Sequence, residues 1–323
     1  MNRFGRALLA CVVLLSAMGP ASAAPWAYIT NQASNDVSIV DGERLTEVAR
    51  VPVGKSPAGV VVSEAAHRVF ISNADAPSIS AIDLRTGTLV AELRLESTVV
   101  GMAAAPDGKT LYLADWYRDQ LLVVDTSTLS IQRSVPVGHV PAGVVVSPDG
   151  AWVFVANRED NDVSIIDARD GESIGRVPVG EHPFALGLTP DGRRLLAANV
   201  VSNDVSIIDV TERKETTRIP VGTAPYGIAF NADGSRAFVT NQHAGSVSVI
   251  DLASQTVSAT WPAAEAPEGI AWSSGRVWVV SWMEDRLQLL DEHSGKEVAS
   301  VDLGSNPRGF GPFLTATVPE IGQ

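Results

Sequence analysis

The chain has 323 residues, with 37 acidic and 24 basic side chains, a formal net charge of −13 at pH 7 and a single cysteine. Such an acidic balance repels a phosphate backbone, so we expect neither nucleic acid nor an anionic membrane surface as a partner. A length of this order is enough to build a large hydrophobic core without disulfide bonds.

The first residues are typical of a secretory signal peptide, because two basic residues (Arg3 and Arg6), an apolar run and the small residues 21–23 follow one another. We expect cleavage after Ala23 and a periplasmic or secreted location. The apolar run is shorter than the roughly 20 residues of a membrane span, so we expect no membrane span. A lipoprotein site at Cys11 is a weaker alternative, because little apolar sequence precedes it.

Cleavage after Ala23 would change the composition of the chain. It would remove the only cysteine and two of the 24 basic side chains, leaving 22 against 37 acidic ones and a formal charge of −15. The mature chain would then hold no disulfide, no cysteine-ligated metal and no covalently attached c-type haem.

A repeat of about 42 residues fills the rest of the chain. Each copy contains a run such as Asp-Val-Ser-Ile-Ile-Asp, and the last residue of the run is an aspartate. Successive aspartates of this kind lie 42 residues apart, except for a last interval of 40. These aspartates are Asp41, Asp83, Asp125, Asp167, Asp209, Asp251 and Asp291. Seven copies leave no room for a second domain, so we expect a signal peptide over residues 1–23 and one domain over residues 24–323.

Each copy is predicted to contain four short strands. In the copy that begins near Pro141, the strands are expected over residues 144–146, 152–156, 163–166 and 173–179, with a hairpin turn at 147–150. Proline lacks the N–H that a central strand needs, so the fourth strand should be the outer edge of its sheet. The prolines in fourth strands are Pro52, Pro136, Pro178, Pro220 and Pro262. Seven copies of four antiparallel strands predict an all-β, seven-bladed β-propeller.

The two ends of the repeat array are incomplete in a complementary way. The array starts at a second strand, residues 26–30, and ends at a first-strand pattern, residues 307–314, with no second strand after it. We therefore expect the C-terminal strand to be the innermost strand of the first blade. It would close the ring by pairing with the N-terminal strands.

The second strands carry a short signature. Examples are Tyr28-Ile29-Thr30-Asn31, Phe70-Ile71-Ser72-Asn73, Phe154-Val155-Ala156-Asn157 and Phe238-Val239-Thr240-Asn241. Together with the Asn-Asp-Val-Ser-Ile-Ile-Asp and Val-Pro-Val-Gly runs, they resemble the YVTN-repeat family of seven-bladed propellers over essentially the whole mature chain. The resemblance implies an exported bacterial or archaeal protein. The wider group includes lactonase-type enzymes and propeller partners of quinoprotein metabolism, and the motif itself is structural.

The copies differ most at one end of the expected propeller, where the loop entering the first strand and the loop joining the second and third strands meet. The residue after the first-strand proline is small or apolar in three copies and then becomes Phe184, Tyr226, Glu268 and Arg308. Loops carry most propeller functions, and aromatic residues are enriched at recognition surfaces. The predicted ligand or partner site comprises Trp116, Tyr117, His139, His182, Phe184, Tyr226, Glu268, Trp282, Asn306 and Arg308.

The favoured interpretation is a monomeric, non-enzymatic binding or scaffold protein that holds a protein or small molecule at this end. The chain has no Gly-x-Ser-x-Gly motif, so we predict no catalytic residue, and we expect no cofactor of its own. Purely structural roles for these residues remain open as alternatives. Glu268 and Arg308 can form an ion pair, and the aromatic residues can plug the channel.

Two other functions stay open. The first is a lactonase- or lyase-type enzyme that uses a divalent metal, with Glu268 or His182 as the acid–base group. His139 and His182 alone fall short of a three-ligand metal site. The second is an accessory role in periplasmic quinoprotein or redox metabolism, in which any cofactor would belong to a partner.

Overall fold

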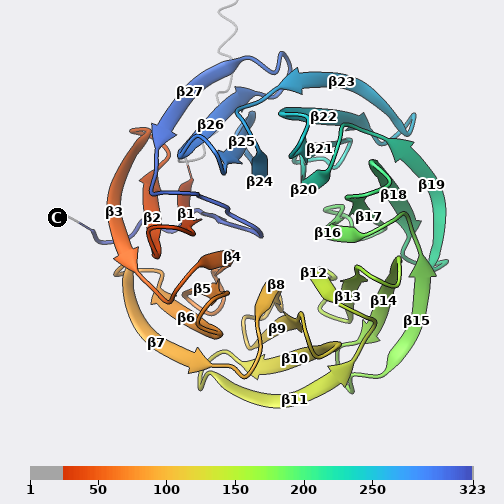
Figure 1. Ribbon diagram of the computed structural model, residues 1–323, viewed down its shortest axis with the longest axis horizontal. Coiled ribbons are helices and arrows are strands. Elements are labelled where there is room, and N and C mark those ends of the chain that lie inside the picture. Colours follow the sequence, from red (N-terminus) through yellow and green to blue (C-terminus); the bar gives the residue numbers. More distant parts are fainter. Residues whose placement is uncertain (1–24, 322–323) are drawn as a thin grey trace, which may run out of the picture.

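The computed structural model describes residues 25–321, which form a ring of seven blades around a central axis (Figure 1). Each blade is a four-stranded antiparallel sheet, and this part of the chain contains no helix. The prediction of a seven-bladed propeller with four antiparallel strands per blade is confirmed.

The strands of each blade run from the axis outward. The innermost strands are β4 (Pro57–Ser63), β8 (Val99–Ala104), β12 (Pro141–Val146), β16 (Pro183–Leu188), β20 (Pro225–Phe230), β24 (Pro267–Ser273) and β28 (Leu314–Thr315). The second strands are β1 (Trp26–Asn31), β5 (Arg68–Asn73), β9 (Thr110–Asp115), β13 (Trp152–Asn157), β17 (Arg194–Asn199), β21 (Arg236–Asn241) and β25 (Arg276–Ser281).

The third strands are β2 (Asp36–Asp41), β6 (Ser78–Asp83), β10 (Gln120–Asp125), β14 (Asp162–Asp167), β18 (Asp204–Asp209), β22 (Ser246–Asp251) and β26 (Arg286–Asp291). The outer strands are β3 (Thr46–Pro52), β7 (Thr88–Arg94), β11 (Ser130–Pro136), β15 (Ser173–Pro178), β19 (Lys214–Pro220), β23 (Thr256–Pro262) and β27 (Glu297–Asp302). The five repeat prolines therefore lie at the ends of outer strands, as predicted.

The ring closes through the C-terminal segment, which runs into the centre of the ring after β27 (Figure 1). β28 pairs antiparallel with β1, so the predicted closure is confirmed. The regular strand is short, because Gly309 and Gly311 have φ values of 61° and 121° and Pro312 follows them. The segment also contacts the next blade: the Val60 N–H donates to the Phe310 carbonyl at 2.9 Å.

A buried polar network explains the asparagine and serine of the repeat. The Asn157 side-chain amide on β13 donates to the Ser164 hydroxyl on β14 at 2.8 Å, and its oxygen accepts from the Gly138 N–H at 2.9 Å. Buried polar groups need such partners to offset the loss of water. The same amide-to-serine bond forms at Asn31, Asn73, Asn199 and Asn241.

The core lies between neighbouring blades, where sheets pack face to face. One large aromatic side chain on the second strand of five blades is fully buried: Tyr28, Phe70, Phe154, Phe238 and Trp278. These are the first letters of the YVTN-like signature or their equivalent. Burying such side chains is the main driving force for folding here.

The glycine two positions after the first-strand proline allows neighbouring innermost strands to approach closely. A Cβ on Gly143 would lie 2.3 Å from the Phe184 carbonyl oxygen, and one on Gly269 would lie 2.4 Å from the Arg308 carbonyl oxygen. Only glycine permits this approach. The motif therefore positions the variable residues Phe184 and Arg308 around the axis.

The expected signal peptide, residues 1–23, lies outside the described residues. Within residues 25–321, no helix has the length and apolar character that crossing a bilayer requires.

Candidate functional site

The loops entering the innermost strands and the loops joining second to third strands lie at one end of the propeller. Backbone hydrogen bonds tie each pair together: Val200 N–H donates to the His182 carbonyl at 3.0 Å, and Trp282 N–H donates to the Ala266 carbonyl at 3.1 Å. We call this end the loop face. All ten residues of the predicted site lie in its loops or at the start of its innermost strands.

Four aromatic side chains close the axis at the loop face, and we call them the aromatic layer: Trp116, Phe184, Tyr226 and Phe310. The Phe184 ring centroid lies 4.6 Å from that of Tyr226, 4.9 Å from that of Phe310 and 6.1 Å from that of Trp116. Phe184 and Tyr226 are only 8% and 7% exposed. The layer therefore plugs the channel. This agrees with the alternative that these aromatic residues serve packing.

Phe310 was missed as a site residue. It follows Pro307 by three positions in the last, incomplete copy, and its signal was the first-strand pattern without a partner strand. Its ring reaches Phe184 and Tyr226 because the C-terminal segment enters the ring centre.

Arg308 joins the aromatic layer to two other blades. Its guanidinium donates to the Gln32 side-chain oxygen at 2.9 Å and to the Tyr226 hydroxyl at 3.2 Å. It also lies 5.5 Å from the ring centre of Trp282, which is a cation–π distance. These contacts hold a positive charge at the edge of the aromatic layer.

Glu268 is fully buried beneath this arginine. Its Oε1 accepts from the Gln242 side-chain amide at 2.6 Å. Its Oε2 lies 3.5 Å from Arg308 Nη1, an ion-pair distance without hydrogen-bond geometry, and receives no hydrogen bond from any described residue. Burial raises the pKa of Glu268 to about 7, and Arg308 and Gln242 only partly offset this effect.

His139 and His182 lie on either side of the loop over residues 158–160. His139 Nδ1 is 2.7 Å from Asp160 Oδ1, and the side chain is 69% exposed. The hydrogen bond to Asp160 raises the pKa of His139. His182 Nε2 lies 3.7 Å from Glu159 Oε2, while its buried Nδ1 has no hydrogen-bond partner within residues 25–321. The Nδ1 of His139 is therefore held by a carboxylate, whereas the Nδ1 of His182 is buried without a hydrogen-bond partner among the described residues.

The remaining predicted residues lie outside the aromatic layer. Trp282 Nε1 donates to the Gln32 side-chain oxygen at 3.3 Å, and Asn306 Nδ2 donates to the Trp282 carbonyl at 3.2 Å. Tyr117 is 73% exposed. The structure thus forms two groups from eight of the ten predicted residues. One group is the aromatic layer with Arg308, Glu268 and Trp282, and the other is the pair of histidines. Tyr117 and Asn306 lie at the periphery.

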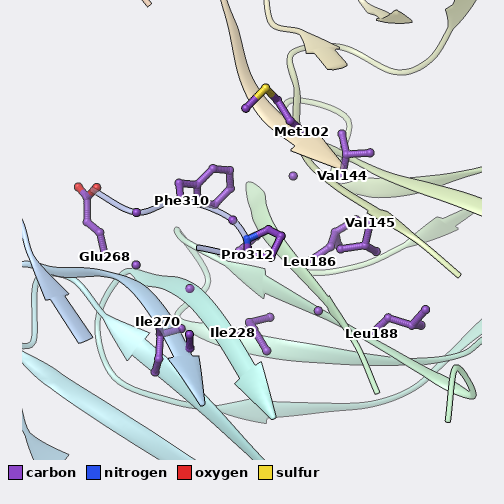
Figure 2. Close-up of a pocket in the computed structure, with 18 of the residues that line it drawn as sticks. Met102, Val144, Val145, Leu186, Leu188, Ile228, Glu268, Ile270, Phe310 and Pro312 are labelled. Carbon is purple, nitrogen blue, oxygen red and sulfur yellow. The ribbon is translucent and has the colours of Figure 1, made fainter. Parts of the chain in front are cut away.

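Beneath the aromatic layer, a cavity of about 320 Å³ lies between the innermost strands, and we call it the axial cavity. Figure 2 shows Glu268 and Phe310 on one side of it and Leu188 on the other. Most of its other lining side chains are aliphatic. They include Met102, Val144, Leu186, Ile228 and Ile270.

A non-haem metal site of the kind used by propeller lactonases would need several ligands close together. Among residues 25–321, no group of three His, Cys, Asp or Glu side chains is placed to hold a metal ion.

The fold and the loop face define the class of this protein: a seven-bladed β-propeller whose variable residues gather at one end of its axis. The family model described as the cytochrome D1 heme domain matches residues 26–229. The chain belongs to this family. No curated protein matches the chain at a significant level.

Solved structures share the fold at low sequence identity. Kuenenia stuttgartiensis hydrazine synthase has a TM-score of 0.71 and 22% identity, covering 77% of this chain and 87% of that one. A functionally unknown protein from Desulfotomaculum acetoxidans DSM 771 has a TM-score of 0.78 and 16% identity, covering 91% and 99%. Dihydro-heme d1 dehydrogenase NirN in complex with DHE has a TM-score of 0.69 and 16% identity, covering 90% and 76%.

Family membership corrects the functional expectation. The interpretation as a plain non-enzymatic binding or scaffold protein is wrong, because the matching family is defined by a haem domain. The alternative of a role in redox metabolism agrees better with this family. We expected no cofactor of the chain's own, but the lack of cysteine in the expected mature chain bears only on covalent haem attachment. A haem held by a histidine and an apolar surface leaves no such motif.

Proposed function

We propose that this protein serves redox metabolism outside the cytoplasm and that its loop face binds a haem-type tetrapyrrole. The single observation that carries the proposal is His139, a histidine oriented by a carboxylate on the loop face of a chain from the cytochrome D1 heme domain family.

The residues around His139 fit an iron ligand. An imidazole that binds a metal through one nitrogen usually donates its other N–H to a carboxylate or a carbonyl. Asp160 accepts at His139 Nδ1, so Nε2, which is exposed and lies 3.9 Å from Asp119 Oδ2, is the nitrogen that would bind iron once the ring is neutral. Asp160 is itself held by the Arg176 guanidinium. His182 fits less well, because its buried Nδ1 has no acceptor among the described residues.

The rest of the loop face fits the macrocycle. Trp116 and Phe310, the partly buried rings of the aromatic layer, offer an apolar surface for a flat ligand, and Arg308 offers a cation for its carboxylates. The layer closes the axis, so the ligand would lie on the loop face rather than in the channel. When bound, the haem would supply a redox-active iron. The chain's own residues would bind it, orient it and restrict water on one of its sides.

Spectroscopy with a defined haem tests the proposal. Purified protein is titrated with hemin, and the Soret band of a histidine-ligated haem is measured. His139→Ala is expected to lose the ligation spectrum, and Asp160→Asn is expected to weaken binding roughly 10- to 100-fold, as second-sphere changes at metal sites do. His243→Ala is the matched control, since His243 is an exposed histidine of the same face. Equal spectra for wild type and His139→Ala would refute the assignment.

Export and the finer family resemblance belong to the same proposal. We propose that the chain is a YVTN-type propeller of the periplasm or cell exterior, with cleavage after Ala23. The amino-terminal signature and the repeat motifs support this. Intact mass spectrometry of the protein from the cell envelope tests it. A mass that retains residues 1–23 would contradict it.

A further inference from the structure

The outer strand β7 (Thr88–Arg94) is the most exposed edge of the ring. It is the end strand of the sheet formed by β4–β7 and lies on the rim (Figure 1). Six of its seven residues are exposed, whereas each of the other six outer strands has three or four exposed residues. Its next-to-last residue, Leu93, is only partly buried. The equivalent residues of the other outer strands are all buried: Val51, Val135, Val177, Ile219, Trp261 and Val301.

The sequence of β7 contains no proline. An exposed edge strand presents unpaired backbone groups that invite another strand, and proline at the edge prevents such pairing. The outer strands of five blades end in proline, but the last residue of β7 is Arg94. Arg94 opposes Ser78 of β6 in the same way that Pro52 opposes Asp36 of β2. β7 therefore keeps a backbone N–H at a position where five blades have none.

The backbone groups of Glu92 and Arg94 point away from the sheet. The N–H of the next residue, Leu95, turns inward and donates to the Pro77 carbonyl at 2.9 Å. Successive residues of an antiparallel strand alternate between inward and outward hydrogen bonding. The N–H and carbonyl groups of Arg94, and those of Glu92 two positions before it, are therefore the ones that an added strand would bond.

A second copy of β7 fits this edge in one register. When two β7 strands pair antiparallel about a two-fold axis at Leu93, Glu92 of each copy lies opposite Arg94 of the other. Opposite charges on facing residues stabilise a strand pair, and like charges destabilise it. A shift of the axis by one residue would place Glu92 opposite Glu92 or Arg94 opposite Arg94. Charge complementarity therefore selects the axis at Leu93.

The same register brings apolar residues together on the other face of the strand pair. Side chains alternate between the two faces of a strand, so Ala91, Leu93 and Leu95 share the face opposite to that of Glu92 and Arg94. Leu93 would face its own copy across the axis, and Ala91 would face Leu95. Covering these exposed or partly buried side chains removes apolar area from water, which favours association.

The other outer strand without proline, β27, does not fit a second copy of itself in this way. Its charged residues, Glu297 and Asp302, are both acidic, so no register of two β27 strands brings opposite charges together. Glu297 also accepts from the Gln288 side chain at 2.6 Å. Self-complementary charge is therefore a property of β7 and not of every edge that lacks proline.

We propose that two copies of this chain associate through their β7 edges, as an antiparallel pair with its two-fold axis at Leu93. The pair joins two four-stranded blades into one sheet of eight strands and leaves both loop faces free. One pair of seven-residue strands is a small contact beside the about 1,200–2,000 Å² that stable interfaces bury, so the dissociation constant is expected to be roughly micromolar or weaker. The proposal departs from the monomer expected from the sequence.

Charge exchange tests the register, with sedimentation velocity measured over a range of protein concentrations. The wild type is expected to show a reversible monomer–dimer equilibrium. Glu92→Arg opposes two cations and Arg94→Glu opposes two acids, so each variant alone is expected to dimerise at least roughly tenfold more weakly. An equimolar mixture of these two variants restores both ionic pairs between unlike chains, so it is expected to form a 1:1 dimer. The double variant Glu92→Arg/Arg94→Glu is expected to dimerise as the wild type does.

A proline variant tests the backbone bonds. Arg94→Pro removes the outward N–H and introduces the residue that five other blades carry at this position. It is expected to be monomeric while its urea midpoint stays close to that of the wild type. Lys214→Glu is the matched control for Arg94→Glu, because it makes the same charge change on an exposed residue of another outer strand, β19, and it is expected to leave dimerisation unchanged.

Three results would overturn the proposal. A wild type that remains monomeric up to submillimolar concentration would mean that β7 does not bind a second copy. A dimer that persists in Arg94→Pro, or in both single charge variants, would place the contact elsewhere on the chain. Failure of the mixed single variants to associate would refute the register centred on Leu93.

Discussion

Replacing Glu268 by glutamine should make the protein less sensitive to alkaline pH. The native carboxyl has a pKa raised to about 7 by burial, whereas its ordinary value is 4.5. Between these values the native state retains a proton that the unfolded state has released. Stability therefore falls as pH rises through this range.

The size of the effect follows from the two pKa values. From about pH 5 to about pH 8, the ionisation of Glu268 lowers the free energy of unfolding by about 2.5 kcal/mol. Glu268→Gln has a similar shape and no proton to lose, so this part of the pH dependence should disappear. The pKa of the exposed His139 is also raised, so its ionisation also lowers stability as pH rises. This contribution is the same in the wild type and in Glu268→Gln, so it cancels when the two proteins are compared.

Urea unfolding at about pH 5, 6.5 and 8 measures the effect, with the midpoint and slope recorded for each protein. Glu265→Gln, an exposed change in the same loop, should behave as the wild type does. The reasoning is refuted if Glu268→Gln loses as much stability between pH 5 and pH 8 as the wild type. That result would mean that Glu268 is already ionised, or accessible to water, at low pH.

Three further predictions test the fold and the loop face. Gly269→Ala should lower stability by about 2 kcal/mol because its Cβ would overlap a carbonyl of the neighbouring strand, whereas Gly175→Ala, which meets nothing within 4 Å, should change it little. Denaturant midpoints compare the two. Truncation before Pro307 should abolish cooperative unfolding, because it removes the ring closure; an unchanged melting curve would contradict this. Asp160→Asn should lower the pKa of His139, as seen in the NMR shifts of its ring protons, and an unchanged pKa would contradict the hydrogen bond.

Much of the architecture could be predicted from local sequence. The 42-residue spacing, the turn at 147–150 and the prolines of the fourth strands identify blades, strands and edges, since turns and edges depend on residues close in the chain. The ring closure was also predictable, because an array that starts at a second strand and ends at a first strand can complete one blade by pairing its ends.

The site was predictable only in outline. The loop and strand pattern indicated that the ten residues share one end of the propeller, but not which side chains meet. Phe310 joins Phe184 across the axis, and Asp160 orients His139 from a different loop of the blade. Such contacts depend on the side-chain directions of distant segments, which the repeat does not encode.

The sequence by itself determined the period, the strands and their order, because hydrogen bonding and turn formation within a blade are local. It also determined the way the ring closes, because the two incomplete ends of the array complement each other. Tertiary structure alone decided that Glu268 is buried with one unpartnered oxygen, that the aromatic residues close the axis, and that a cavity remains beneath them. The physical reason is that these features arise where seven innermost elements converge. Burial and electrostatics at that point depend on all the blades together.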